Sequence, residues 1–306
     1  YDSLILTCAR RKDHYADALR LLRELVEGDH TQLWPDAYTY NAVLQGSARH
    51  GDLTTARWIL ADMVRSVMAD THRLRRPNED TLAHVFWTYA VYQPPIDWHQ
   101  LQSTEATQSS DAEGHVAEAA PSPTFTHALP QTSSDVLAEA RALMARILAD
   151  QGHDETAAHP LSSVRVSPRL LHAYLAVLTH HLPPERRLHA LVHEVEHGVF
   201  AQSRAQANGH TLAMLLGECA VSRDRALADD VARRTWAQWT DMERAYVHTP
   251  QRRHQGIDAK LVSRMWALMI RHHAKSFRID EGLELVRRFL EMYPCLLYTS
   301  DAADAE

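Results

Sequence analysis

The 306-residue chain has little cysteine, glycine and lysine, and no long apolar run. Its three cysteines, Cys8, Cys219 and Cys295, lie far apart, which gives no disulfide framework and no zinc spacing and favours a reducing compartment. None of the 10 glycines falls in a phosphate-binding loop pattern. No apolar run approaches the ~18 residues that a membrane-spanning helix needs, so we expect no membrane span.

The formal charge of -7 is unevenly distributed along the chain. Segment 93–134 carries five acidic residues and no Lys or Arg, and 301–306 carries three more acids, so the remainder has a formal charge of +1. Arg supplies nearly all the positive charge of that remainder, since Lys12, Lys260 and Lys275 are the only lysines. An Arg-rich, near-neutral body is compatible with a nucleic-acid partner, because guanidinium groups contact phosphates bidentately and stack on bases.

The apolar pattern predicts an all-α fold. Apolar content is 45% with few glycines, which favours helices around a core. Apolar residues recur at helical spacing over 16–26, and similar helical stretches follow along the chain, with no convincing strand. We predict roughly six helical pairs, which open near residues 1, 37, 77, 167, 210 and 257.

One unit is more specific than this general pattern. Residues 35–44 read PDAYTYNAVL, residues 51–57 read GDLTTAR, and Met63 follows. This unit resembles a pentatricopeptide repeat, in which a Pro-Asp end precedes Thr-Tyr-Asn on the first helix and Gly-x-x-x-x-Ala opens the second. The resemblance implies a right-handed α-solenoid of helix-turn-helix repeats. Two alternatives stay open: an irregular helical bundle, and tetratricopeptide repeats, whose Trp and Leu-Gly signature is missing here.

The resemblance also suggests how the chain is divided. Residues 1–92 would hold the first two repeats and the first part of the third. Segment 93–134, which is acidic and rich in Ser, Thr, Pro, Gln and Ala, is predicted to be a disordered insertion. Residues 135–294 would hold the remaining degenerate repeats, and 295–306 a non-native or disordered tail. Because the chain begins at Tyr1 inside a helical pattern, we expect it to be a fragment.

In this family, single-stranded RNA lies along the first helices, and one base is read per repeat by a first-helix residue and a repeat-end residue. Carried over to this sequence, Asn41 and Asn78 form a pair that resembles a pyrimidine reader, for cytosine more than uracil. Asp2 and Asp36 align in the first unit, where the base choice stays open. Ala83 aligns in the third unit and cannot hydrogen-bond a base. The register of the later units is left unassigned.

The alternatives for these positions are structural. Asn41 could be a solvated residue near a helix N-terminus. Tyr38 and Tyr40 are expected to pack between helices rather than stack on bases.

A formal His-Glu-x-x-His match lies at 193–197. On a helix the two histidines would share one face and could hold zinc, with Glu194 as a base. Glu196 interrupts the pattern and no third ligand follows, so we interpret the segment as a solvated helix face. The pairs at 180–181 and 272–273 are expected at helix ends or on the surface. We therefore expect no catalytic site, no metal and no cofactor, and a protein that is not an enzyme.

The resemblance implies an RNA-binding protein of the mitochondrial matrix, acting in transcript processing, stability, splicing or translation. Mitochondrial transcripts would be its partners, with the mitochondrial ribosome or other proteins as further candidates. The alternative is a protein-binding α-solenoid scaffold, tetratricopeptide-like or ribosome-associated, without direct sequence-specific RNA binding. Arginines along the first helices would favour RNA, whereas an acidic or apolar face would favour a peptide partner.

Overall fold

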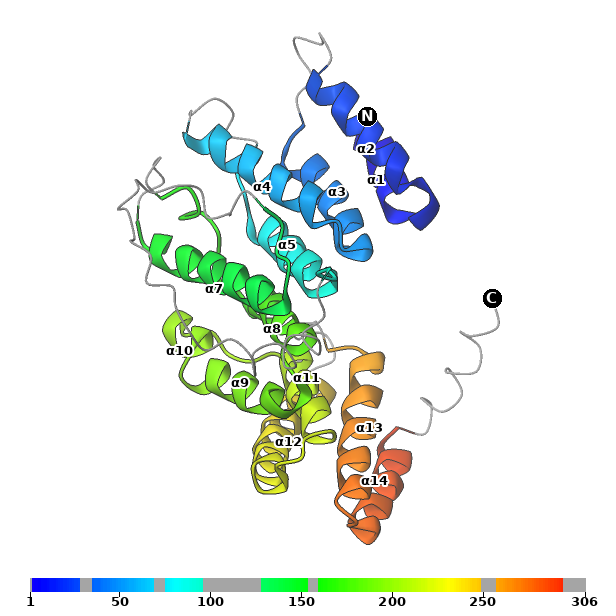
Figure 1. The fold of residues 1–306 in the computed structure, drawn as a ribbon. Coiled ribbons are helices and arrows are strands. Elements are labelled where there is room, and N and C mark those ends of the chain that lie inside the picture. Colours follow the sequence, from blue (N-terminus) through cyan, green and yellow to red (C-terminus); the bar gives the residue numbers. More distant parts are fainter. Residues whose placement is uncertain are drawn as a thin grey trace, which may run out of the picture. The chain divides into compact units, whose positions relative to one another are not determined.

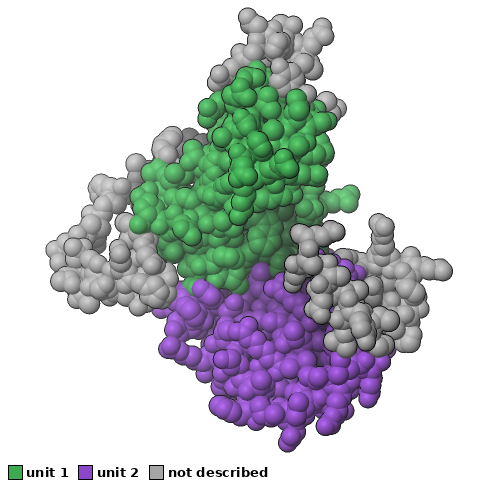
Figure 2. Space-filling view, turned by 90° about the vertical axis from the view of Figure 1, so that its right-hand side faces the viewer, with its two compact units in different colours: residues 1–182 green, residues 183–306 purple. Residues whose placement is uncertain are grey.

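The computed structural model describes residues 2–27, 35–68, 75–95, 128–153, 159–248 and 257–293. Within these ranges the regular secondary structure is helical and contains no β-strand, which confirms the predicted all-α class (Figure 1). The chain forms two compact units, residues 1–182 and 183–306, which Figure 2 shows in different colours. No helix in the described ranges is both long and apolar enough to cross a membrane.

The first unit is built from two kinds of helix. Helices α1, α3, α5 and α8 pack each against the next in that order, and we call them the first helices of their repeats. Helices α2 and α4 pack against α1 and α3, and α7 packs against both α5 and α8. The bounds are α1 Asp2–Arg10, α2 Tyr15–Glu27, α3 Ala37–His50, α4 Leu53–Met68, α5 Glu79–Val91, α7 Ser133–Asp150 and α8 Pro168–His181, with a short 3-10 turn at Lys12–His14 (Figure 1).

Side-chain caps fix where the first helices of this unit begin. The Asp36 carboxylate accepts the backbone N–H of Thr39 at 2.8 Å at the start of α3, and the Asn78 amide oxygen accepts that of Thr81 at 3.0 Å at the start of α5. Ser167 caps α8, with a proline as the first helical residue, as predicted. Each cap satisfies a backbone donor that the first turn would otherwise leave unpaired.

The core of the first unit contains charged groups as well as apolar side chains. Arg57 and Arg75 are buried. The Arg57 guanidinium lies 3.8 Å from a carboxylate oxygen of the buried Glu139, and Arg75 donates to the carbonyl of Pro35 at 3.1 Å. The Tyr89 hydroxyl donates to the same Glu139 carboxylate at 2.8 Å, and burial raises the pKa of that hydroxyl. Buried charges need such partners, because desolvation costs several kcal/mol per ion.

The second unit repeats the pairing of helices. Helix α9 packs against α10 and α11, α11 against α12 and α13, and α13 against α14. Trp239 and Trp266 lie in its core, whereas Trp236 is only half-buried and meets Trp266 edge-on, with ring centroids 5.1 Å apart. The bounds are α9 Pro184–Glu196, α10 Val199–Ser203, α11 Gly209–Cys219, α12 Arg225–His248, α13 Ala259–Lys275 and α14 Ile279–Met292 (Figure 1).

Several boundaries differ from the predicted ones. The short helix α10 was not predicted. Helix α7 begins at Ser133, and the chain just before it is held by Arg57, which donates to the carbonyl of Ala128 at 2.9 Å, and by Tyr92, which donates to the carbonyl of Pro130 at 3.0 Å. The remainder of the predicted insertion, 96–127, lies outside the described residues. So does the tail 295–306.

Candidate nucleic-acid interface

The first helices of the first unit share one solvent-facing surface. Helix α5 packs against α3, α8, α4 and α7, so its accessible side chains after the first residue form a single stripe at i, i+4, i+7 and i+11. Side chains near the same positions of α3 and α8 are also at least partly accessible. We call this surface the first-helix face; its residues are Tyr38, Asn41 and Gln45 on α3, Asp80, His84, Trp87 and Val91 on α5, and Arg169 and His172 on α8.

The structure brings Asn41 and Asn78 into direct contact. The Asn41 amide nitrogen donates to the Asn78 amide oxygen at 3.1 Å. The Thr81 hydroxyl lies 2.7 Å from the Asn41 amide oxygen and accepts the backbone N–H of Asn78 at 3.1 Å. The residue on one helix and the residue that ends the repeat, 37 positions apart, therefore form one polar cluster.

The capping bond fixes the orientation of the Asn78 amide. Its oxygen accepts from both the Thr81 backbone N–H and Asn41, so its nitrogen faces away from the helix end. Asn41 uses its oxygen for the Thr81 hydroxyl and one of its two amide hydrogens for Asn78. The pair is therefore left with unused N–H donors, one on Asn41 and two on the exposed Asn78.

The other predicted pair, Asp2 and Asp36, also lies in one cluster. The Thr39 hydroxyl lies 2.6 Å from a carboxylate oxygen of Asp2 and 3.0 Å from one of Asp36. This cluster repeats the geometry of the asparagine cluster with acidic side chains. It offers acceptors only, and its two negative charges disfavour a nearby phosphate.

The third repeat lacks such a pair. Ala83, which aligns with Asn41, is buried and offers no hydrogen bond, as expected. Helices α5 and α8 are joined instead by polar contacts outside that position. The Ser167 hydroxyl donates to Glu79, and Arg169 forms an ion pair with Asp80.

Aromatic side chains are more prominent on the first-helix face than the sequence suggested. Tyr40 is buried, as expected, but Tyr38 is 56% exposed, so the prediction that both tyrosines pack between helices is wrong for Tyr38. Trp87 meets His172 edge-on, with ring centroids 5.7 Å apart. Burial lowers the pKa of His84 to about 4, assisted by the Arg169 charge, so this ring is neutral at pH 7.

Arginines contribute little free positive charge to this face. Arg169 is paired with Asp80, and Arg49 donates to the carbonyls of Ala9 and Arg10 at 3.3 and 2.8 Å. The buried arginines of the core are held by internal partners. The first-helix face is therefore mainly polar and aromatic rather than basic.

The caps also settle the register of the later repeats, which sequence reasoning left open. Asn41 and Ala83 stand five residues after their caps, Asp36 and Asn78. Counting five residues from the next first-helix caps gives the equivalent positions in α8, α11 and α13, which are His172, Ala213 and Ser263. The signal was present in the sequence as Ser, Asn or Asp one residue before each helix.

The structure places the His-Glu-x-x-His segment at the end of a helix, where its two glutamates make other contacts. Helix α9 ends at Glu196, and His197 is its C-terminal cap. Glu194 accepts the backbone N–H of Val199 at 3.2 Å, and Glu196 forms an ion pair with Arg234. No group of three or more potential ligands occurs anywhere in the part of the chain that the structure describes.

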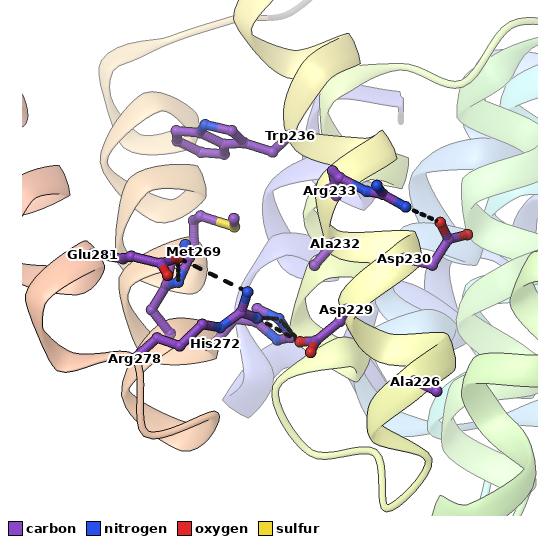
Figure 3. Close-up of a pocket in the computed structure, with 11 residues that line it drawn as sticks. Ala226, Asp229, Asp230, Ala232, Arg233, Trp236, Met269, His272, Arg278 and Glu281 are labelled. Atoms are coloured by element: carbon purple, nitrogen blue, oxygen red, sulfur yellow. Dashed lines mark hydrogen bonds and ion pairs between the residues drawn. The ribbon is translucent and has the colours of Figure 1, made fainter.

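A pocket of about 480 Å³ lies in the second unit among α12, α13 and α14 (Figure 3). Asp229 accepts from His272 at 2.9 Å and from Arg278 at 2.6 Å. His272 and His273 lie in the last turn of α13, so the predicted position at a helix end is confirmed. Both are buried, so the alternative prediction, that they lie on the surface, is wrong. Burial lowers the pKa of both histidines, and their acidic neighbours only partly offset this effect. The charges of the pocket are thus paired among themselves.

Comparison with known proteins agrees with this architecture. The fold and the paired helices define an all-α helical-repeat protein. Residues 38–66, which cover most of α3 and α4, match the model of the PPR repeat, so the chain carries a pentatricopeptide repeat where the sequence pattern placed one. Neither a search of curated proteins nor a search of solved structures found a match.

Proposed function

We propose that the protein binds single-stranded RNA along the first-helix face of the first unit. The observation that carries the proposal is the Asn41–Asn78 cluster. It joins a first-helix residue to the residue that ends the same repeat, on an accessible surface, with unused amide donors. The PPR repeat over 38–66 supports RNA as the ligand, because repeats of this kind read one base each.

The donors of the asparagine pair favour cytosine. Cytosine presents two adjacent acceptors, N3 and O2, on its Watson–Crick edge, whereas N3 of uracil carries a hydrogen. Amide N–H groups of Asn41 and Asn78 would therefore satisfy both adjacent acceptors of cytosine, whereas in uracil one of the two amide groups would face the N3 hydrogen and only a neighbouring carbonyl oxygen would be satisfied. Acceptor-only carboxylates, as in the cluster of Asp2 and Asp36, would instead require a base edge that presents donors.

Aromatic side chains on the same face provide a second source of affinity. Tyr38, Trp87 and His172 are at least partly accessible, and bases stack on such rings for about 1–3 kcal/mol each. From the repeat type we further propose a role in mitochondrial RNA processing, stability, splicing or translation, in the matrix. Imaging of the tagged protein in cells, with a matrix marker, tests that location.

The test of RNA binding uses the purified chain and a randomised single-stranded RNA pool. We expect enrichment of cytosine at one position, and loss of that enrichment in Asn41→Ala. Losing a base-specific pair of hydrogen bonds costs about 1–3 kcal/mol, which is about 5- to 150-fold in affinity for the selected RNA. Gln45→Ala is the matched control, because Gln45 lies one turn further along the same stripe of α3 and should leave the base preference unchanged.

Absence of RNA retention even at low salt would contradict the proposal. It would favour the protein-binding scaffold, for which the exposed Tyr38 and Val91 would offer apolar contacts. If the chain retains RNA without enriching cytosine, and Asn41→Ala changes nothing, the protein binds RNA but the asparagine pair does not select the base.

A further inference from the structure

Helix α13 has an unusual charge composition. Between Ala259 and Lys275 it contains two lysines and two arginines, and no aspartate or glutamate. At 100° per residue, the four basic side chains lie within an arc of roughly 60° and span about 22 Å along the helix. All four are exposed. We call Lys260, Arg264, Arg271 and Lys275 the α13 basic stripe.

The charges of the α13 basic stripe are not used by the fold. None of them has an acidic partner within 4.0 Å among the described residues, whereas some other exposed arginines of this unit do, such as Arg233 with Asp230 at 2.6 Å. Like charges four residues apart, as at Lys260 and Arg264, destabilise an isolated helix by a few tenths of a kcal/mol. The stripe therefore weakens the helix slightly, and no acidic side chain among the described residues pairs with it to offset this cost.

The stripe also stands in a specific register. Helix α13 is the first helix of its pair, is capped by Asp258 and is followed by α14. Lys260, Arg264 and Arg271 stand two, six and thirteen positions after that cap. Counted from the cap of α5, the same offsets give Asp80, His84 and Val91, which belong to the first-helix face of the first unit. The stripe thus occupies the α13 counterpart of that face.

We infer that the α13 basic stripe binds the phosphodiester backbone of single-stranded RNA and supplies the electrostatic part of its affinity. This inference rests on the proposed function. The first unit has little free positive charge on its first-helix face, since Arg169 is paired and Arg49 holds the end of α1. A protein that reads bases still needs phosphate contacts, which commonly provide much of the affinity. The four charges of the stripe are exposed on a first helix and have no acidic partner among the described residues, so they can make these contacts.

The experiment compares two variants of equal charge in the full chain. In the stripe variant, Lys260, Arg264, Arg271 and Lys275 are replaced by Gln. In the control variant, four exposed arginines of the same unit outside the stripe are replaced by Gln; these are Arg223, Arg233, Arg244 and Arg287. Far-UV circular dichroism and thermal melts verify that both variants fold. The probe is a randomised single-stranded RNA of about 20 nucleotides, titrated between about 50 and 200 mM salt.

For the stripe variant we expect the slope of log affinity against log salt to become shallower by up to about 3, at about 0.7 per phosphate contact on a single strand. At about 0.1 M salt, that change corresponds to a loss of affinity of 10²- to 10³-fold. The single variant Arg264→Gln should change the slope by about 0.7. The cytosine preference of the Asn41 pair should remain in all of these variants.

The inference is overturned if the stripe variant and the control variant lose the same affinity and slope. If the wild-type chain binds RNA and selects cytosine while the stripe variant equals the control, this inference fails and the proposed function stands. If the wild-type chain binds no RNA, both fail together. Loss of binding to polyglutamate without any loss of RNA binding would assign the stripe to an acidic protein and would also overturn the inference.

Discussion

Gly46 lies at the closest approach between α3 and the ring of Tyr15. A Cβ atom on Gly46 would stand 2.7 and 2.8 Å from two ring carbons of Tyr15 and 3.2 Å from the carbonyl oxygen of Ala9. The ring cannot swing away easily, because its hydroxyl is hydrogen-bonded to Ser47 at 2.8 Å and to Asp52 at 2.9 Å. We therefore predict that Gly46→Ala destabilises the first unit.

Two opposing terms set the size of this effect. Replacing glycine by alanine in a helix interior stabilises the helix by about 1 kcal/mol, because alanine has the higher helix propensity. Overpacking by one methyl group costs about 1–3 kcal/mol, and loss of the buried hydrogen bonds of Tyr15 adds about 1 kcal/mol. The sum is a net destabilisation of about 1–3 kcal/mol, and the strain would also displace α1, which carries Asp2 to its contact with Thr39.

Urea unfolding followed by circular dichroism measures the change. The control is Gly217→Ala in α11, where the new methyl group would meet only Leu268, at 3.8 Å, so we expect a gain of about 0.5–1 kcal/mol. In a Tyr15→Leu background, which removes the crowded ring atoms, Gly46→Ala should become neutral or stabilising. If Gly46→Ala stabilises the wild-type chain as much as Gly217→Ala does, the packing argument is refuted.

Two further predictions concern buried ionisable groups of the first unit. Arg57→Met removes a guanidinium from the buried carboxylate of Glu139 and should cost about 3–5 kcal/mol of unfolding free energy; pairing it with Glu139→Gln should recover most of that loss, and equal instability of both variants would contradict the reasoning. Because burial lowers the pKa of His84 from 6.5 to about 4, its neutral form stabilises the fold above about pH 6.5, and this stability is lost as the pH falls to about 4. The loss is about 3 kcal/mol, so urea unfolding of His84→Gln should show a flatter pH dependence than wild type by up to that amount, and parallel profiles would refute the assignment.

Helix starts and residue pairs could be predicted from the sequence where a short local pattern, such as a cap or a repeat motif, determines them. The Pro-Asp and Thr-Tyr-Asn pattern predicted where α3 begins. The alignment to the repeat paired Asn41 with Asn78, 37 residues away, and the two side chains are in contact in the structure. The burial of Tyr40 and the exposure of Tyr38 could also have been predicted, because residues two apart on a helix point about 200° apart and cannot both face one core. The caps that fix the later registers were readable in the same way.

Other features depend on contacts that no local pattern encodes. The burial of Arg57 requires Glu139, which is 82 positions away and lies beyond the predicted insertion. His272 and His273 were expected at a helix end or on the surface; they do end a helix, but α12 and α14 pack around them and both are buried. In each case the deciding interaction joins segments that are distant in the sequence, so composition and periodicity could not reveal it.

In the proposed mechanism, different parts of the chain select the base and attract the phosphates, because the first-helix face has little free positive charge. At the first repeat, Asp2 and Asp36 place two carboxylates where RNA would lie, and at the third repeat Asp80 neutralises Arg169. Such a face would repel phosphates slightly while it reads bases through neutral amides, so RNA needs attraction from elsewhere on the chain. If the α13 basic stripe provides that attraction, salt should weaken binding of all RNAs by the same factor and leave the preference for cytosine unchanged, because the amide contacts carry no net charge. If the cytosine preference disappeared as salt was added, charged contacts would be recognising the base as well as the phosphates. That result would contradict the assignment of base recognition to the neutral amides and of phosphate binding to the α13 basic stripe.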